Sequence, residues 1–234
     1  MRDQSEWRAK FALACYLALV GGIFVSSLIV GLTFLGGGID PLDLPFPIAL
    51  VLVPVNEAII LVITLVFARY RDAGLGELGL KKPGIRALTI VLMVAVPLFL
   101  LGASISVFEE LVFGPDPLAE AYIRSVVPRN LLQLIAMIAL SFVLVGPCEE
   151  LAFRGFVQRG FENSFGAREG LLITSILFGI LHGLNTLYAI APSFVGGLVL
   201  GYVWQRTGGN TTASALLHGA NNSISLVVAF LFTV

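Results

Sequence analysis

Three polar patterns interrupt otherwise apolar stretches in the C-terminal half of the chain. They read Glu149-Glu150-x-x-x-Arg154, Phe178-x-x-x-His182 and His218-x-x-x-Asn222, and they contain both histidines of the sequence. Glu150 and Arg154 are four residues apart, so on a helix they pair on one face, while Glu149 is rotated by about 100° from its neighbour. Two adjacent acids in an apolar site do not both stay ionised without help. We therefore expect Arg154 to keep one acid charged and Glu149 to serve as a general base.

The composition places these patterns in a membrane. Of the 234 residues, 57% are hydrophobic and 12% charged, against about 45–50% and about 25% in soluble domains. A soluble globule is therefore excluded as the leading interpretation, and so is disorder, which needs low hydrophobicity and high net charge. A net charge of −1 gives no basic footprint for nucleic acid. The two cysteines are too few for a disulfide framework and lack the spacing of a zinc motif.

Long apolar runs predict an all-α fold, a polytopic transmembrane helix bundle of about seven spans, since about 20 apolar residues cross the hydrocarbon core. The expected spans are residues 11–35, 46–68, 87–112, a fourth from 130 to 146 that continues as a helix to about 163, and then 168–184, 189–206 and 211–234. Short connections and the lack of internal repeats indicate a single membrane domain over 1–234. Within it, 1–112 holds three N-terminal spans and 130–225 the catalytic core that bears the motifs.

Lysines and arginines are distributed unevenly between the two ends of this bundle. Of the 14, only Arg124 and Arg129 fall at the end that holds the loop between the third and fourth spans. The others, from Arg2 in the N-terminal segment to Arg206, fall at the opposite end. The positive-inside rule then predicts a multi-pass protein of the cell membrane with a cytoplasmic N-terminus and an external C-terminus.

The three patterns are expected to meet at a similar depth. Glu149 lies 14 residues before Asn163, and His182 lies 15 residues after Ala167, which correspond to about 21 and 22 Å along antiparallel helices. His218 and Asn222 are 9 and 13 residues beyond Gly209, about 14 and 20 Å along the last span. We expect the cluster to line a polar cavity in the cytoplasmic half of the bundle, open to the cytoplasm.

Other polar and small residues inside the spans have weaker interpretations. Glu57 in the second span is either a protonated structural group or part of the cavity lining. Glu109 and Glu110 are interpreted as a charged, interfacial end of the third span. Gly179-x-x-x-Gly183 and Gly197-x-x-x-Gly201 are expected to bring helices close together rather than to form a site.

The three patterns together resemble the motifs of the CPBP family, the CAAX-protease and bacteriocin-processing or self-immunity membrane peptidases. Glu149, Glu150 and Arg154 match its Glu-Glu-x-x-x-Arg motif, and the two histidine patterns match Phe-x-x-x-His and His-x-x-x-Asn. The resemblance covers residues 130–225, with a further short match at Leu78-Gly79-Leu80. It implies an intramembrane endopeptidase.

The resemblance leaves two versions of the chemistry. In a metal-free version, Glu149 deprotonates a water held with His182, and His218 and Asn222 donate hydrogen bonds to the oxyanion. In the other, zinc is held by His182, His218 and Glu149, since zinc hydrolases use three protein ligands and a water. The sequence has no His-Glu-x-x-His helix, and an amide such as Asn222 is a better donor than zinc ligand, so the metal-free version is favoured.

The expected partners are a peptide or membrane-protein tail as substrate and the surrounding membrane lipid. Eukaryotic members of the family cut prenylated tails, but no residue pattern here indicates prenylated substrates or an oligomeric state. The main alternative is a non-proteolytic membrane immunity or scaffold protein of the same fold. A proton-coupled transporter is disfavoured, because transporters tend to repeat their motifs in both halves.

Overall fold

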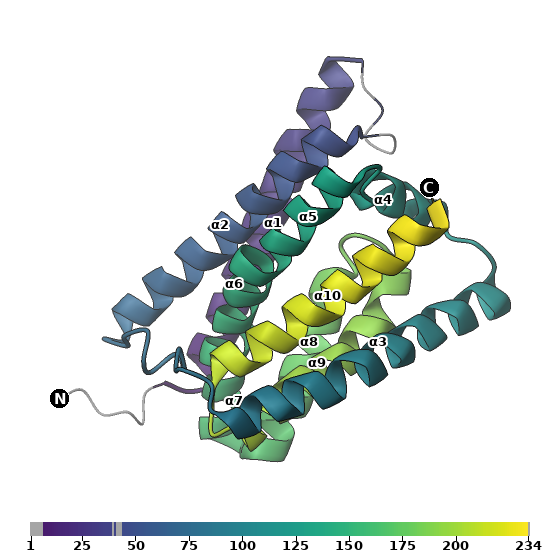
Figure 1. The fold of residues 1–234 in the computed structure, drawn as a ribbon. Coiled ribbons are helices and arrows are strands. Elements are labelled where there is room, and N and C mark those ends of the chain that lie inside the picture. Colours follow the sequence, from purple (N-terminus) through teal and green to yellow (C-terminus); the bar gives the residue numbers. More distant parts are fainter. Residues whose placement is uncertain (1–6, 39, 41–43, 234) are drawn as a thin grey trace.

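The computed structural model describes residues 7–38, 40 and 44–233, and every regular element in these ranges is a helix (Figure 1). Arg2, one of the basic residues behind the expected orientation, lies outside them. Three long helices come first: α1 (Ala9–Gly36), α2 (Phe46–Tyr70) and α3 (Ile85–Phe113). Their bounds agree to within two residues with the first three expected spans, because each is a continuous apolar run flanked by polar or glycine-rich segments.

The first motif lies on a long continuous helix with two π-helical stretches. It consists of α5 (Leu131–Leu140), the π-helical stretch η2 (Ser141–Val145), α6 (Gly146–Glu150), a second π-helical stretch η3 (Leu151–Gln158) and α7 (Arg159–Phe165). Glu149 and Glu150 thus close a short α-helical segment between two π-helical ones. Such stretches are rare and are frequent at functional sites.

The other two motifs lie on helices that return across the bundle. These are α8 (Ala167–His182), then the single turn η4 (Leu187–Ala189) with α9 (Ile190–Arg206), and finally α10 (Thr211–Thr233). The chain reverses between α7 and α8 at Gly166, whose φ of +94° is a left-handed conformation that favours glycine.

Within the described ranges, six helical segments are long and apolar enough to cross a membrane, which indicates a multi-pass membrane protein. This number differs by one from the expected number of about seven. The fifth expected span, 168–184, is α8, whose 16 residues extend only about 24 Å, less than the ~30 Å of hydrocarbon. Large apolar side chains such as Leu92 and Leu132 are 79% and 77% exposed on the outside of the bundle, as residues facing lipid tails would be.

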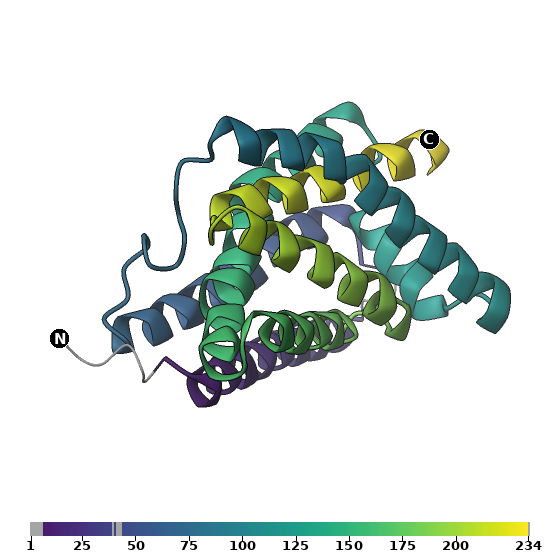
Figure 2. The same cartoon turned by 90° about the horizontal axis from the view of Figure 1, so that it is seen from below.

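The helices that carry the motifs lie in the middle of the bundle. Seen from below, α8, α9 and α10 lie between α1 on one side and α3 on the other (Figure 2). In agreement with this view, α1 packs on η3 and α7, while α3 packs on α9 and α10. The largest buried apolar cluster joins α1 to η3, with Leu19, Phe153 and Phe156 fully buried.

Close helix contacts depend on glycines, as expected for a membrane bundle. A Cβ at Gly179 on α8 would stand 2.7 Å from the Ile190 carbonyl oxygen, and one at Gly197 on α9 would stand 3.1 Å from Ser175 Cα. A Cβ at Gly146 on α6 would stand 2.7 Å from the Ala215 oxygen of α10. These positions confirm that the Gly-x-x-x-Gly patterns serve helix packing, and Gly146 brings α10 against the helix that carries the glutamates.

A helix not expected from the sequence lies between the third and fourth spans. This helix, α4 (Pro117–Val126), begins after Asp116, whose Oδ1 accepts a hydrogen bond of 2.9 Å from the Leu118 amide. The other carboxylate oxygen of Asp116 accepts a hydrogen bond from Thr186 in the connection between α8 and α9. Tyr188 Oη donates to the Gly114 oxygen at 2.8 Å. Two segments far apart in the sequence are thereby joined at this end of the bundle.

Candidate active site

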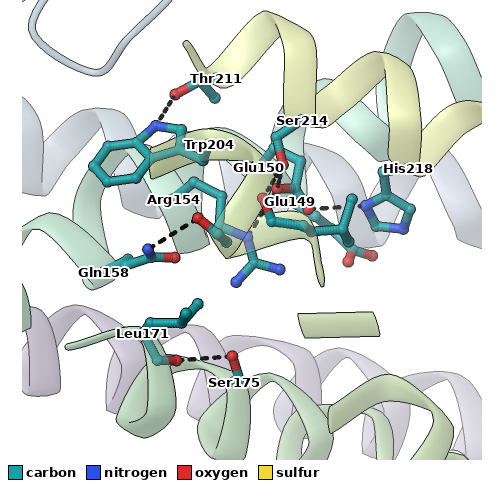
Figure 3. A network of polar contacts seen from close by, with 12 residues as sticks. Glu149, Glu150, Arg154, Gln158, Leu171, Ser175, Trp204, Thr211, Ser214 and His218 are labelled. Atoms are coloured by element: carbon teal, nitrogen blue, oxygen red, sulfur yellow. Dashed lines mark hydrogen bonds and ion pairs between the residues drawn. The ribbon is translucent and has the colours of Figure 1, made fainter. Parts of the chain in front are cut away.

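Glu150 is the centre of a fully buried polar network (Figure 3). Arg154 Nε donates to Glu150 Oε2 at 2.9 Å, and Ser214 Oγ donates to the same oxygen at 2.6 Å. The expected i,i+4 pairing of Glu150 with Arg154 is thus present, with both side chains fully buried. Because three partners on two helices hold Glu150, this carboxylate is fixed in place.

His218 is the third partner of Glu150 and is fixed by it. Its Nδ1 lies 3.0 Å from Glu150 Oε1, and the imidazole approaches the carboxylate from the side opposite Arg154 in Figure 3. An ionised carboxylate only accepts hydrogen bonds, so Nδ1 is the donor, and Nε2 is left to face the adjoining cavity. A carboxylate that orients a histidine in this way fixes its ring position and keeps a hydrogen on Nδ1.

Glu149 has none of the hydrogen-bond partners that hold Glu150. Its exposed fraction is 8%, and its buried Oε2 has no hydrogen-bond partner among the described residues. His182 Nε2 lies 3.8 Å from that oxygen, which is too long for a direct hydrogen bond. The expectation that one glutamate is tied up and the other left free therefore agrees with the contacts.

His182 is oriented by its own helix and by Phe178. Its Nδ1 lies 2.9 Å from the Phe178 carbonyl oxygen; because a carbonyl accepts, Nδ1 carries the hydrogen and Nε2 faces Glu149. The Phe178 ring lies 4.4 Å from the His182 ring and 4.9 Å from the Arg154 guanidinium. Phe178 thus contacts residues of two motifs and fixes their separation.

Two cavities meet at the histidines. One, of about 510 Å³, is bounded by α2, α4, α6 and α10 and includes Glu149; the other, of about 290 Å³, is bounded by α3, α8, α9 and α10. Four residues line both: His182, His218, Asn222 and Ser225. Asn222 lies one helical turn beyond His218, as the spacing predicts, so the structure brings Glu149, His182, His218 and Asn222 to one cavity.

The larger cavity extends away from the end of the bundle that holds the basic loops. Beyond Glu149 its lining continues to Leu44, Tyr122 and Val126, near the N-terminal end of α2 and on α4. On the opposite side of Glu150, the residues Leu78 and Phe156 are fully buried. The lining residues therefore do not extend toward the basic end, where the cavity was expected to open. The sequence interpretation did not take into account the loop that carries Leu78, which packs into the basic end.

Glu57 lines the same cavity as Glu149. Its exposed fraction is 5%, and it stands on α2, outside the three motifs. The sequence left its role open, and the structure places it in the cavity lining. Cys148, next to Glu149, is 3% exposed and belongs to the apolar cluster, where it serves packing.

Ser214 was not identified from the sequence. It is fully buried on α10, its single hydroxyl hydrogen goes to Glu150 at 2.6 Å, and its Oγ lies 3.1 Å from the Leu200 carbonyl oxygen. The available signal was its position four residues before His218, which places both side chains on one helix face. A serine in an apolar helix has too many other uses for that spacing alone to single it out.

The candidate metal ligands are not arranged as a zinc site in the described residues. Zinc hydrolases need three protein ligands near one point, and the described residues contain no group of three His, Cys, Asp or Glu side chains that could hold a metal ion. His218 Nδ1 is engaged by Glu150 and His182 Nδ1 by a carbonyl oxygen. The three candidate ligands His182, His218 and Glu149 face one cavity but do not converge as a ligand set.

The chain is thus a multi-pass helical membrane protein with two buried glutamates, two histidines and an asparagine gathered inside the bundle. Residues 131–224 match the sequence model of the family described as Type II CAAX prenyl endopeptidase Rce1-like. This part of the chain is a domain of that family, in agreement with the resemblance seen in the motifs. Searches of curated proteins and of solved structures found no match.

Proposed function

We propose that the protein is an intramembrane endopeptidase that hydrolyses peptide bonds with a water activated by Glu149. The family of residues 131–224 implies a protease. The observation that carries the mechanism is the pair formed by Glu149 Oε2 and His182 Nε2, 3.8 Å apart at the cavity wall. When His182 is neutral, both atoms are acceptors, and a water that donates one hydrogen to each spans that separation with two hydrogen bonds of about 2.8 Å.

In the proposed reaction, Glu149 takes a proton from this water while the oxygen attacks the carbonyl carbon of a peptide bond. General-base assistance of this kind contributes about 10²–10⁴-fold to a rate. The oxyanion that forms is stabilised by Asn222 and by His218, which as an imidazolium donates from Nδ1 to Glu150 and from Nε2 into the cavity. Fixed donors of this kind stabilise a developing negative charge strongly in a water-poor site.

Glu150 and Arg154 have a positioning role in this proposal. Both are fully buried, and neither lines the cavity beside Glu149. Their function is to hold His218, which cannot rotate without losing its contact with Glu150. The substrate is a peptide or a membrane-protein tail that reaches the cavity from within or beside the bilayer.

The test uses the purified full-length protein in lipid nanodiscs. Wild type, Glu149→Gln and the control Glu169→Gln, which alters an exposed residue of α8, are incubated with membrane-anchored peptides with and without a prenyl group. New peptide termini are measured by mass spectrometry. Glu149→Gln keeps the shape of the side chain but takes up no proton, so cleavage should fall to background while Glu169→Gln matches wild type. Undiminished cleavage by folded Glu149→Gln would overturn the mechanism.

A further inference from the structure

Glu57 occupies the middle of a membrane-spanning helix without a hydrogen-bond partner for one of its oxygens. It stands 11 residues after Phe46 and 13 before Tyr70, the ends of α2, or about 17 and 20 Å along the axis. Its exposed fraction is 5%, and its buried Oε2 has no partner among the described residues. Ionisable groups at this depth are costly and mark functional sites by default.

The cavity that Glu57 lines is also lined by Glu149. The helices that carry them, α2 and α6, pack against each other. Glu149 Oε2 is likewise buried without a hydrogen-bond partner in the described part of the chain. Two carboxylates from different helices therefore face one cavity, and each has an oxygen that the protein leaves unused.

No lysine or arginine is among the described residues that line this cavity. The contrast with Glu150 is direct, because that carboxylate has the Arg154 guanidinium at 2.9 Å. The imidazolium of His218, which also lines the cavity, is paired with Glu150 at 3.0 Å. Two carboxylates in a low-dielectric site without a cation of their own do not both ionise, and such a pair holds one proton between its members. The other titratable side chains among the described lining residues are Tyr122 on α4, His182 on α8 and His218 on α10. Cys148 stands next to Glu149 on α6 but does not line the cavity.

We propose that Glu57 shares a proton with Glu149 and delivers it to the leaving amine, as the acid partner of the base Glu149. The inference rests on the proposed peptidase function. Glu149 accepts a proton from water, and the resulting hydroxide adds to the carbonyl carbon. The C–N bond then breaks as the nitrogen receives the proton of Glu57. The proton on Glu149 passes to Glu57 and restores the starting state, so one water is consumed for each bond cut.

Glu109 differs from Glu57 in its distance from the site. Glu109 on α3 also has a buried Oε2 without a hydrogen-bond partner in the described residues, but it lines neither of the two cavities at the histidines. It stands near the end of its helix, four residues before Phe113. Glu109→Gln is therefore a matched control: the same chemical change in a membrane helix, made away from the site.

The kinetic test compares wild type, Glu57→Gln, Glu57→Asp and Glu109→Gln over a range of pH. Wild-type activity should fall at low pH, when Glu149 gains a proton, and at high pH, when the shared proton is lost. Glu57→Gln should lower kcat by about 10²–10⁴-fold and abolish the decline at high pH, since glutamine has no proton to lose. Glu57→Asp should keep that decline with reduced kcat, and Glu109→Gln should match wild type. A Glu57→Gln protein with wild-type kcat and an unchanged pH profile would overturn the proposal.

A second measurement does not depend on cleavage. Infrared spectra of the protein in nanodiscs should show the carbonyl stretch of a protonated carboxylic acid at neutral pH, and this band should be absent from Glu57→Gln. In Glu149→Gln the pH at which the Glu57 band disappears should change, because Glu57 then ionises without a second carboxylate beside it. A Glu57 band that titrates identically with and without Glu149 would disprove the shared proton. If wild type cleaves nothing, the proposed peptidase function fails, while this titration still decides whether the two glutamates are coupled.

Discussion

The contact between His218 Nδ1 and Glu150 Oε1, 3.0 Å long, joins the third motif to the first across two helices 68 residues apart in the sequence. Glu150 is in turn held by Arg154 and Ser214. A buried carboxylate with three donors is well satisfied, whereas the same group with one donor removed carries a large penalty. The position of His218 at the cavity wall therefore depends on residues that do not reach the cavity themselves.

Arg154→Ala is expected to lower stability and activity together. Removing one partner of a buried ion pair leaves an uncompensated charge and costs about 3–5 kcal/mol. Arg154→Lys should recover only part of the loss, because an ammonium does not reproduce the planar guanidinium that contacts both Glu150 and the Phe178 ring. Thermal unfolding in detergent and peptide cleavage measure the two effects. Wild-type melting and wild-type activity in Arg154→Ala would show that the pair has no positioning role.

Asn222→Ala is expected to reduce turnover by about 10²–10³-fold, the effect of deleting one oxyanion donor. The effect should appear in kcat rather than in KM, because the donor acts on charge that develops during the reaction. Ser223→Ala is the matched control, since its hydroxyl donates to the Gly219 oxygen of its own helix and it lines neither cavity. A chelator should leave activity unchanged. Chelator-sensitive activity that returns when zinc is added would instead support a metal mechanism.

The sequence predicted the helices and the meeting of the motifs because both follow from simple periodicities. A run of apolar residues determines the bounds of α1, α2 and α3, and a rise of 1.5 Å per residue is enough to place Glu149, His182 and His218 at one depth. The pairing of Glu150 with Arg154 likewise follows from their spacing of four residues on a helix.

Other features depend on contacts that no spacing reveals. Ser214 became a partner of Glu150 only because α10 packs closely on α6 at Gly146. The same is true of Glu57, whose place in the cavity depends on how α2 turns toward α6. The N-terminal signal of α4, Asp116 followed by a proline at the first helical position, was present in the sequence. It was missed because the segment was interpreted as a connection between spans.

A topology experiment tests the orientation independently of activity. Reporters fused at Gly76, in the basic loop, and at Pro117, at the start of α4, should read cytoplasmic and external respectively. A cysteine introduced at Ser225, which lines both cavities, should react with a membrane-impermeant maleimide from the Pro117 side. The native Cys15 and Cys148 are both buried, so the wild-type protein, without the introduced cysteine, is the negative control for labelling. Labelling only from the Gly76 side would contradict the direction in which the larger cavity extends.

The contact between Asp116 and Thr186 should make stability depend on pH at low pH. The hydrogen bond from Thr186 lowers the pKa of Asp116 below its usual value, so the folded protein binds a proton at this site less readily than the unfolded chain. The contribution is therefore complete above the unfolded value of about 3.9 and is lost as the pH falls through and below it. Asp116→Asn should melt below wild type at pH ~7, and the difference should be smaller at pH ~3. An equal difference at both pH values would argue against this origin.

Gly79→Ala is expected to damage the site from a distance. Gly79 has a φ of +86°, and a Cβ there would stand 2.4 Å from the Gly209 oxygen and 2.5 Å from Thr211 Oγ1. Its carbonyl oxygen accepts a hydrogen bond of 2.8 Å from the Thr211 amide, and Thr211 Oγ1 donates to the Leu78 oxygen at 2.6 Å. The loop that carries Gly79 therefore holds the first residue of α10, two helical turns before His218.

A side chain at Gly79 must both enter a left-handed conformation, at about 1–2 kcal/mol, and push α10 away from the loop. We expect a lower melting temperature and a fall in kcat with KM little changed, since the displaced group is His218 rather than a binding surface. Gly76→Ala in the same loop is the control, because no atom lies within 4 Å of a Cβ there, and it should match wild type in both measurements. If Gly79→Ala lost stability but kept full kcat, the loop would serve folding alone and not the position of His218.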